Sequence, residues 1–417
     1  MKEYILKILR WAVKELSILT LKKYRPTIVG VTGSVGKTST KLAIAAVLGD
    51  ERSVRYSREN FNNELGLPLV ILGSYGKISG TLFWLKVIFN SIKNLFKRVE
   101  YPEILILEYG VDRPGDMKYL LSIAKPNIGV ITAIGETPAH VEYFDGPEAV
   151  AREKGRLVES LLSMGHAILN GDDKVVMELK ERTRGRLITF GFEKGASVRV
   201  ANFESKEQFG IPVGISFKLE YGGSFVPVKL NGIFGKHQAY ASAAAACVGL
   251  SFGMNLHNIA EGLAKNYKPA EHRMSVVTGI NNSVVLDDSY NANPLSMKMG
   301  LDSLNSIPGK RKIAVLGDML EIGKYAMDEH KKIGAIAGNF VDILFTVGSR
   351  SQFIAEGAKA VGMAKKNIFS FGDVDEAIEE VKKNIRKGDT ILVKGSHSMN
   401  LEKLVDEIKL PLPEKQK

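Results

Sequence analysis

Cysteine is nearly absent from this sequence of 417 residues. The single cysteine, Cys247, excludes an intramolecular disulfide and a cysteine-based zinc cluster. The sequence also contains no internal repeat, and it has neither an aromatic-basic stripe nor a recognised motif of the kind that binds nucleic acid. We therefore expect a protein of a reducing cytoplasm that does not have nucleic acid as its partner.

Apolar runs that could cross a bilayer are also lacking. No formally charged residue lies between Lys236 and Glu261, but this stretch contains histidine, glutamine and asparagine, and its centre consists of small residues. A buried helix packed closely on a sheet explains it better than a membrane span. With 45% hydrophobic and 25% charged residues, the composition excludes a wholly disordered, collagen-like or multi-span membrane chain.

Length and charge set two further bounds. At about 100–200 residues per domain, the chain is long enough for two to three domains. Lysine and arginine (57) exceed aspartate and glutamate (46), which gives a net charge of +11. This balance favours polyanionic partners such as nucleotide phosphates, anionic lipid or nucleic acid, without choosing among them.

Two segments combine an apolar face with a basic one. In the first 25 residues, apolar residues recur at helical spacing, and polar or charged residues fall between them; the apolar set is Ile5, Ile8, Leu9, Ala12, Leu16 and Leu19, and the polar set is Glu3, Lys7, Arg10, Lys14 and Ser17. The second segment is Ser79 to Lys97. Peripheral contact with a membrane surface would explain either segment, and so would packing within the protein. For the segment at the N-terminus we favour packing on the next domain.

The remainder of the chain alternates short apolar runs with helical patterns. We expect strands at Thr27–Thr32, Ile104–Glu108, Ile128–Ala133, Ala167–Asn170, Leu187–Phe190, Val284–Asp287, Lys312–Leu316, Ile343–Val347 and Thr390–Val393. Such alternation predicts an α/β fold with doubly wound parallel sheets, and residues 196–232 predict an antiparallel section. We expect an amphipathic helix at 1–25, a central domain at 26–268, a C-terminal domain at 269–410 and a frayed tail at 411–417.

The strongest local signal is a phosphate-binding loop: Thr32, Gly33, Ser34, Val35, Gly36, Lys37, Thr38 and Ser39. It follows an apolar strand and opens a helical pattern, which is the context that such a loop requires. Glycines let the backbone wrap a phosphate, and the helix N-terminus faces the anion. Lys37 is expected to reach the outer phosphates and Thr38 to bind Mg²⁺. The strict pattern has a glycine where this chain has Val31.

Three further residues are candidates for metal or acid chemistry. Glu108 ends a predicted strand, at the ligand edge of a parallel sheet, where it could hold Mg²⁺ or its water. His140 lies just beyond the strand around residues 128–133, and Lys154 follows in a helical segment. By themselves, a lone histidine and a lone lysine are more often structural or solvated.

Several runs in order along residues 27 to 405 resemble the Mur ligase family, and its D-alanyl-D-alanine-adding branch in particular. Besides the phosphate loop, they are residues 61–69 (FNNELGLPL), 108–110 (EYG), 139–144 (AHVEYF), 154–155 (KG), 235–238 (GKHQ), 287–294 (DDSYNANP), 316–323 (LGDMLEIG) and 394–396 (KGS). Each run is modest alone, but together and in order they are specific for the family.

The resemblance implies a P-loop ATPase domain with a parallel sheet, followed by a Rossmann-like α/β domain. It also implies an ATP-dependent amide ligase that forms an acyl phosphate, which an amine then attacks. In such an enzyme Lys37 and two Mg²⁺ ions neutralise the transferred phosphoryl group. By resemblance, Thr38 and Glu108 hold the first ion, and His140 and Lys154 hold the second. In the family this lysine carries a carbamate, which turns a cation into an oxygen ligand.

The same resemblance assigns residues that contact nucleotide and substrate. Gln238, Arg273 and Asp288 match positions that contact the nucleotide, although the family generally has asparagine at position 238. The candidates on the substrate side are Asn62, Asn63, Asn291, Asn293, Lys394 and Ser396. Turn chemistry before Pro294 explains Asn291 and Asn293 equally well.

Two departures from the family pattern leave the substrates open. Only about 25 residues precede the first ATPase strand, too few for the domain that holds the uridine nucleotide in the family. One alternative is a UDP-linked muramoyl peptide that is held differently, and another is a lipid-linked or polyglutamate-type carboxylate, with the protein at the inner membrane surface. A third is that a partner chain supplies the missing domain. The run Lys394 to Met399 has histidine where the family usually has arginine, which puts the amine acceptor in doubt. An inactive ATP-binding scaffold is a further alternative.

Overall fold

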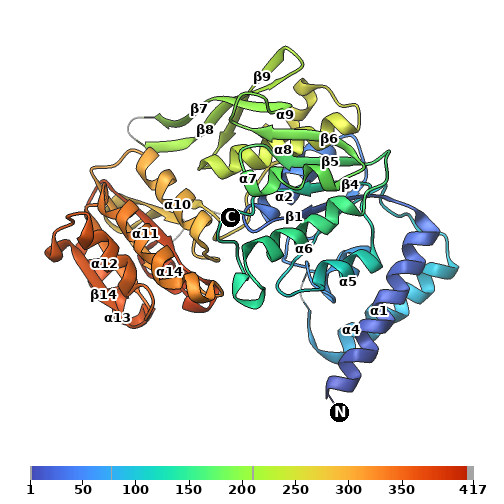
Figure 1. The fold of residues 1–417 in the computed structure, drawn as a ribbon, viewed down its shortest axis with the longest axis horizontal. Coiled ribbons are helices and arrows are strands. Elements are labelled where there is room, and N and C mark those ends of the chain that lie inside the picture. Colours follow the sequence, from blue (N-terminus) through green and yellow to red (C-terminus); the bar gives the residue numbers. More distant parts are fainter. Residues whose placement is uncertain (1, 77, 209–210, 411–417) are drawn as a thin grey trace, which may run out of the picture.

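A computed structural model describes residues 2–76, 78–208 and 211–410, and the expected tail at 411–417 lies outside them. The chain forms two α/β units, each built on one sheet, with α1 and α4 projecting from the first unit (Figure 1). Along the first sheet the strand order is β2-β3-β1-β4-β5-β6-β7-β8-β9, and along the second it is β10-β11-β15-β12-β13-β14.

The first sheet is parallel from β2 to β7 and ends in an antiparallel meander of β7, β8 and β9. Its strands are β1 (Thr27–Thr32), β2 (Val54–Arg55), β3 (Ile104–Glu108), β4 (Ile128–Ile131), β5 (His166–Asn170), β6 (Arg186–Gly191), β7 (Val198–Gln208), β8 (Ile211–Tyr221) and β9 (Ser224–Asn231). The expected parallel strands and the antiparallel section at 196–232 are both present. Helices cover both faces of the parallel part, which is why its strands are continuous apolar runs.

The helices of the first unit follow the expected alternation. They are α1 (Lys2–Tyr24), α2 (Lys37–Leu48), α3 (Gly66–Leu72), α4 (Gly80–Phe96), α5 (Asp116–Ile123), α6 (Pro147–Glu159), α7 (Lys174–Met177), α8 (Lys236–Ser251) and α9 (Leu256–Asn266). The uncharged stretch from Lys236 is a buried helix, as expected, but only as far as Ser251, because the chain turns through Gly253 (φ +81°) before α9. The alanines of α8 let it lie close against β5–β7 and α2.

The second unit is a parallel sheet with one antiparallel edge strand, β10. Its strands are β10 (Ser275–Gly279), β11 (Ser283–Asp287), β12 (Arg311–Gly317), β13 (Ile343–Val347), β14 (Ile368–Phe371) and β15 (Asp389–Lys394), and its helices are α10 (Pro294–Ser306), α11 (Ala326–Gly338), α12 (Gln352–Ala360), α13 (Val374–Asn384) and α14 (Glu402–Ile408). Apolar clusters fill both faces of this sheet. The unit is therefore the doubly wound architecture that the sequence predicts.

Helix α1 packs on the first unit, as we favoured, but through a face that includes only part of the expected apolar set. Its buried residues are Val13, Ser17 and Thr20, and Leu9 and Leu16 complete the contact. Half of the predicted apolar face points away from the protein, because Ile5, Ile8 and Leu19 are exposed. Among the described residues, no helix has the length and apolar character needed to cross a bilayer.

Candidate active site

A cleft of about 270 Å³ lies between the two units. The carboxyl ends of β1, β3 and β4 reach it from the first sheet, and those of β11 and β15 reach it from the second. Loops at these ends carry the lining residues, since parallel strands present their carboxyl ends at one edge. The predicted site residues that line it are Ser34, Val35, Gly36, Lys37, Ser39, Asn62, Glu108, His140, Arg273, Asp288, Asn291, Asn293 and Lys394.

The phosphate loop joins β1 to α2, as its sequence predicts. Gly36 has a left-handed backbone (φ +86°), and a Cβ on Gly33 would come within 2.0 Å of the Thr132 hydroxyl, so both positions require glycine. The loop is anchored to β4, because the Ala133 carbonyl accepts hydrogen bonds from the amides of residues 34 and 35. Lys37 Nζ donates to the Gly33 carbonyl (2.9 Å), and burial lowers the pKa of Lys37. The first-turn amides of α2 remain available to an anion.

Glu108 is the centre of a buried polar cluster at the end of β3. Its Oε2 accepts from Thr38 Oγ1 (3.1 Å) and lies 3.0 Å from Lys41 Nζ, and its Oε1 accepts from Asn62 Nδ2 (3.1 Å). Burial would raise the pKa of Glu108, but Lys41 and then Lys37 outweigh it and lower that pKa to about 2. Glu108 is therefore an anion at any physiological pH.

Lys41 is a functional candidate that sequence analysis missed. Its side chain is 1% exposed although it carries a charge, and Glu108 and the Glu59 carbonyl (3.0 Å) are its partners. A signal was present, because Lys41 lies one helical turn after Lys37 at the start of an otherwise apolar run. A lysine inside such a run requires a buried anion as its partner.

His140 is held between the two units. Its Nε2 lies 3.3 Å from Asp112 Oδ1, and its Nδ1 lies 2.8 Å from Glu321 Oε2 on the C-terminal unit. Both His140 (φ +65°) and Glu321 (φ +60°) adopt left-handed backbones, which non-glycine residues rarely do. Burial lowers the pKa of His140 despite the two carboxylates. The imidazole is thus favoured as a neutral group, the form that binds metals.

Lys154 lies on α6 and is 1% exposed, but it does not line the cleft. Burial, followed by the nearby charge of Lys37, lowers the pKa of Lys154 to about 7. A large fraction of this side chain is therefore a neutral amine near pH 7.

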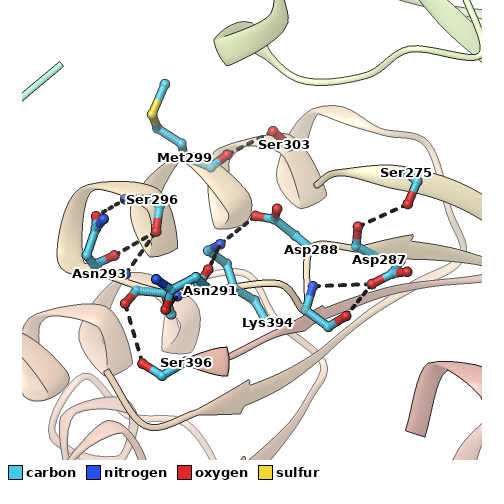
Figure 2. Close-up of polar contacts among 12 residues, drawn as sticks. Ser275, Asp287, Asp288, Asn291, Asn293, Ser296, Met299, Ser303, Lys394 and Ser396 are labelled. Atoms are coloured by element: carbon cyan, nitrogen blue, oxygen red, sulfur yellow. Dashed lines mark hydrogen bonds and ion pairs between the residues drawn. The ribbon is translucent and has the colours of Figure 1, made fainter. Parts of the chain in front are cut away.

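The C-terminal side of the cleft is built around a buried ion pair. Figure 2 shows Lys394 between Asp288 and Asn291: its Nζ lies 2.6 Å from Asp288 Oδ2 and donates to the Asn291 carbonyl (2.8 Å). Arg273 stacks on the ring of Tyr290, with its guanidinium carbon 4.0 Å from the ring centroid. Arg273, Asp288 and Lys394 thus present charge to the cleft from the second unit.

Asn60 connects the two sides of the cleft and was also missed. Its Oδ1 accepts from Thr38 Oγ1 (3.3 Å) and Arg273 Nη2 (3.3 Å), and its Nδ2 contacts the Tyr290 hydroxyl. Its partners lie up to 230 positions away along the chain, so nothing local distinguishes Asn60.

Some predicted residues have structural contacts instead of, or besides, a place in the cleft. Asn63 accepts from the amides of residues 65 and 66 at the start of α3. Asn293 lines the cleft but also caps α10 in a reciprocal capping box with Ser296 (Figure 2). Ser396 accepts from the Leu320 amide (2.9 Å). Gln238 is fully buried in α8 and accepts from the Tyr267 hydroxyl, so its side chain does not reach the cleft.

A second cavity, of about 890 Å³, lies on the other side of the phosphate loop and shares Val35, Gly36, His237 and Met299 with the cleft. It is lined by apolar and aromatic side chains from both units: Phe190, Tyr240, Ala241, Leu295, Met299, Ile333 and Ile336. Tyr240 is fixed by its hydrogen bond to Asp172 (2.7 Å). Nine charged side chains, among them Asp172, Lys236 and Lys298, also line this cavity, so its apolar surface lies beside polar groups that can orient a ligand.

Comparison with known proteins shows the family. Residues 89–249 match the Mur ligase middle domain, and residues 272–397 match the Mur ligase glutamate ligase domain. The chain is 33% identical over 405 residues to the UDP-N-acetylmuramoyl-tripeptide--D-alanyl-D-alanine ligase of Mycobacterium leprae. This alignment covers 91% of this chain and 73% of that protein. The chain belongs to the Mur ligase family.

Other relatives agree. The Bacillus subtilis protein of the same name is 32% identical to this Mur ligase over 406 residues, covering 96% of this chain and 80% of the other. The crystal structure of the MurF ligase from Thermotoga maritima in complex with ADP has a TM-score of 0.78 at 25% identity, covering 95% of this chain and 83% of that one. A Mycobacterium tuberculosis folylpolyglutamate synthase shares the fold, with a TM-score of 0.65, 15% identity and 96% coverage of both chains.

Two oxygen-bearing side chains of this Mur ligase, Thr38 and Glu108, are suitable ligands for Mg²⁺. Among residues 2–76, 78–208 and 211–410, no three histidine, cysteine, aspartate or glutamate side chains gather into a metal-binding group. Mg²⁺, however, commonly takes one or two carboxylates and completes its shell with water and substrate phosphates. Thr38 and Glu108, in contact beside the phosphate loop, are a donor set of that kind.

Proposed function

We propose that this Mur ligase joins an amine to a peptide carboxylate with ATP, and that it adds D-alanyl-D-alanine to a muramoyl tripeptide. The proposal rests on one observation above all. The phosphate loop, the Glu108 cluster and the charged groups of the second unit converge on one cleft. The named function of relatives at 32–33% identity over most of this chain supports the substrates.

We propose that the triphosphate of ATP lies along the phosphate loop and its base in the second cavity. The loop residues 33–39 then wrap the phosphates, with Lys37 on the outer ones. The base would stack among Phe190, Tyr240 and Met299, because an aromatic base gains most from apolar and aromatic contacts. His237 borders both spaces and is neutral, since burial lowers its pKa to about 4.

Phosphoryl transfer requires alignment and charge neutralisation more than covalent help. We propose that Thr38 and Glu108 hold one Mg²⁺, and that His140 and Lys154 hold a second; such ions neutralise charge on the phosphates. Lys37 would stabilise negative charge on the transferred group. Arg273 and Asp288 would hold the nucleotide from the second unit, so that ATP holds the cleft closed.

The buried amine of Lys154 suits carbamate formation. Its neutral nitrogen attacks the carbon of CO₂, and the proton that the nitrogen loses passes to solvent, leaving an N-carboxylate anion. Only the unprotonated amine has the required electron pair, and a pKa of about 7 makes it abundant at neutral pH. We propose that this carbamate, beside His140, completes the second cation site.

We assign the two substrates to opposite sides of the cleft. The carboxylate donor would approach Asn62, which Glu108 orients, and Asn63 would shape the adjacent loop. The amine would approach Asn291, Asn293, Lys394 and Ser396. The exposed apolar faces of α1 and α4 favour a second candidate, a lipid-linked donor at the cytoplasmic face of the inner membrane. A partner chain that binds the uridine nucleotide would serve a UDP-linked donor.

The test is turnover of Mg-ATP with UDP-MurNAc-tripeptide, with and without D-alanyl-D-alanine, with the product identified by mass. We expect phosphate release coupled to a mass gain of one dipeptide, and its loss in Lys37→Ala. A protein that binds ATP but forms no product with this donor would overturn the substrate assignment. Product from a lipid-linked or polyglutamyl carboxylate would identify the alternative.

A further inference from the structure

The exposed apolar side chains of the described residues gather on two helices. Ten of the 21 large hydrophobic side chains that are exposed belong to α1 and α4. They are Tyr4, Ile5, Ile8, Trp11 and Leu19 of α1, and Leu82, Leu85, Phe89, Ile92 and Phe96 of α4; we call this set the α1–α4 face. Scattered exposed apolar residues are normal, but a cluster of this size marks an interaction site.

Both helices pack on the protein through a mixed face, in which Val13 of α1 and Val87 of α4 are buried beside Ser17 and Ser91, and both leave large apolar residues exposed. On α1, Arg10 pairs with Glu64 (2.8 Å), Lys14 donates to Ser122 (2.7 Å), and Ser17 is fully buried. A helix that needed only to pack on the protein in water would bury its apolar face instead. This orientation leaves the outer apolar residues accessible to a second apolar surface.

Helix α4 has the same arrangement. It buries Val87 and Ser91, whereas the exposed apolar residues at 82, 85, 89, 92 and 96 follow a spacing of three and four. Phe96 is 87% exposed and Leu82 is 82% exposed, so protein atoms cover little of either. The stripe therefore continues along the whole helix.

The α1–α4 face is part of the folded unit. Val13 and Val87 pack together with α3. Lys23 Nζ donates to the carbonyls of Asn94 (2.8 Å) and Leu95 (3.1 Å) at the end of α4, and Tyr24 stacks on Tyr101, 4.4 Å between ring centroids. The pair projects at the opposite end of the molecule from the C-terminal unit (Figure 1). A surface bound there would leave the cleft open to water.

The charge of these segments favours an anionic partner. Residues 2–24 and 80–98 contain ten lysine or arginine residues and two glutamates, a net charge of +8 out of +11 for the whole chain. About a tenth of the sequence thus carries most of its excess charge. Apolar and aromatic side chains flanked by lysines are the composition that binds the interface of an anionic bilayer.

We propose that the α1–α4 face docks this protein on an anionic lipid bilayer. The apolar residues enter the boundary between headgroups and acyl chains, and Lys7, Lys86, Lys93 and Lys97 contact lipid phosphates. The inference does not depend on the proposed reaction, because none of these residues lines the cleft or the second cavity.

The test is co-sedimentation of the full chain with vesicles of phosphatidylcholine alone, or mixed with phosphatidylglycerol. We expect binding to the anionic vesicles that salt weakens, and far less binding to the neutral ones. Reversing two charges with Lys86→Glu/Lys93→Glu should lower the vesicle partition coefficient at least about tenfold, since each lysine near the surface contributes about 1 kcal/mol. The matched control Lys365→Glu/Lys366→Glu, on the C-terminal unit, should bind like the parent.

A second pair of variants tests the apolar contact. Leu82→Ser/Phe89→Ser should lose binding, whereas Leu162→Ser/Met164→Ser, at 78% and 83% exposure, should keep it. In Trp84→Phe the only tryptophan is Trp11, whose fluorescence should shift to the blue and be quenched by brominated lipid. Circular dichroism and ATP binding without vesicles confirm that each variant folds.

Three results would overturn the proposal. The first is no binding to anionic vesicles by the folded parent. The second is binding that the variants of the α1–α4 face leave unchanged. The third is a parent protein that does not bind vesicles but forms a dimer in solution, where Leu82→Ser/Phe89→Ser is a monomer. That result would assign the α1–α4 face to contact with a second copy of the chain.

Discussion

Replacing Lys154 with methionine should make the first unit more stable at neutral pH. The pKa of Lys154 is about 7 in the folded protein because the side chain is buried, against 10.5 for a free lysine. Well above pH 10.5 neither state binds the proton, so folding loses nothing there. As the pH falls toward 7 the unfolded chain takes up a proton and the folded chain does not, so wild-type stability decreases. Methionine removes this penalty and keeps an unbranched apolar chain.

The magnitude follows from the shift. At about 1.4 kcal/mol per pKa unit, the free energy of unfolding of the variant minus that of the wild type should grow by roughly 2 kcal/mol between pH 9 and pH 7. Urea unfolding in CO₂-free buffer at these pH values measures the difference. The control Lys118→Met, which removes an exposed lysine, should show no such growth.

Bicarbonate separates stability from function in the same experiment. The proposed carbamate would form mainly in the folded state, where burial keeps the amine neutral, so bicarbonate should stabilise the wild type and leave Lys154→Met unchanged. The variant should also lose ligase activity. A difference in unfolding free energy that does not change with pH, or a variant less stable than the wild type at pH 7, would refute the reasoning.

Three further substitutions test the site. Lys41→Met should lower the free energy of unfolding by about 3–5 kcal/mol, measured by urea unfolding, because it leaves Glu108 charged, buried and without its closest cation; Lys41→Arg should recover part of this loss. Gln238→Ala should lower the free energy of unfolding by about 1–3 kcal/mol, because the Tyr267 hydroxyl loses its acceptor, and should leave the KM for ATP unchanged. A KM that rises several-fold would instead place Gln238 in the nucleotide site. Arg273→Lys should raise the KM for ATP at least several-fold at nearly constant stability, because an ammonium cannot stack as a planar guanidinium does; an unchanged KM would argue against nucleotide contact from the second unit.

The sequence by itself determined the architecture and the location of the loop between β1 and α2. Strands such as Ile104–Glu108 are continuous apolar runs, and the loop from Gly33 to Ser39 has a local requirement for glycine, lysine and hydroxyl groups. Both are properties of neighbouring residues, so they can be predicted without knowing what packs against them. The order of the motifs along the chain was enough to predict the family.

Only the tertiary structure decided the partners of the charged groups. Glu108 and Lys41 are 67 positions apart, so their contact exists only once the first sheet and α2 have formed. Asn60 and Tyr290 are 230 positions apart and meet only when both units are in place. Helical periodicity predicted that α1 has two faces, but it could not predict which face turns toward the protein. That orientation depends on Glu64, Ser122 and the apolar residues of α3, which lie elsewhere in the chain and meet α1 only in the folded molecule.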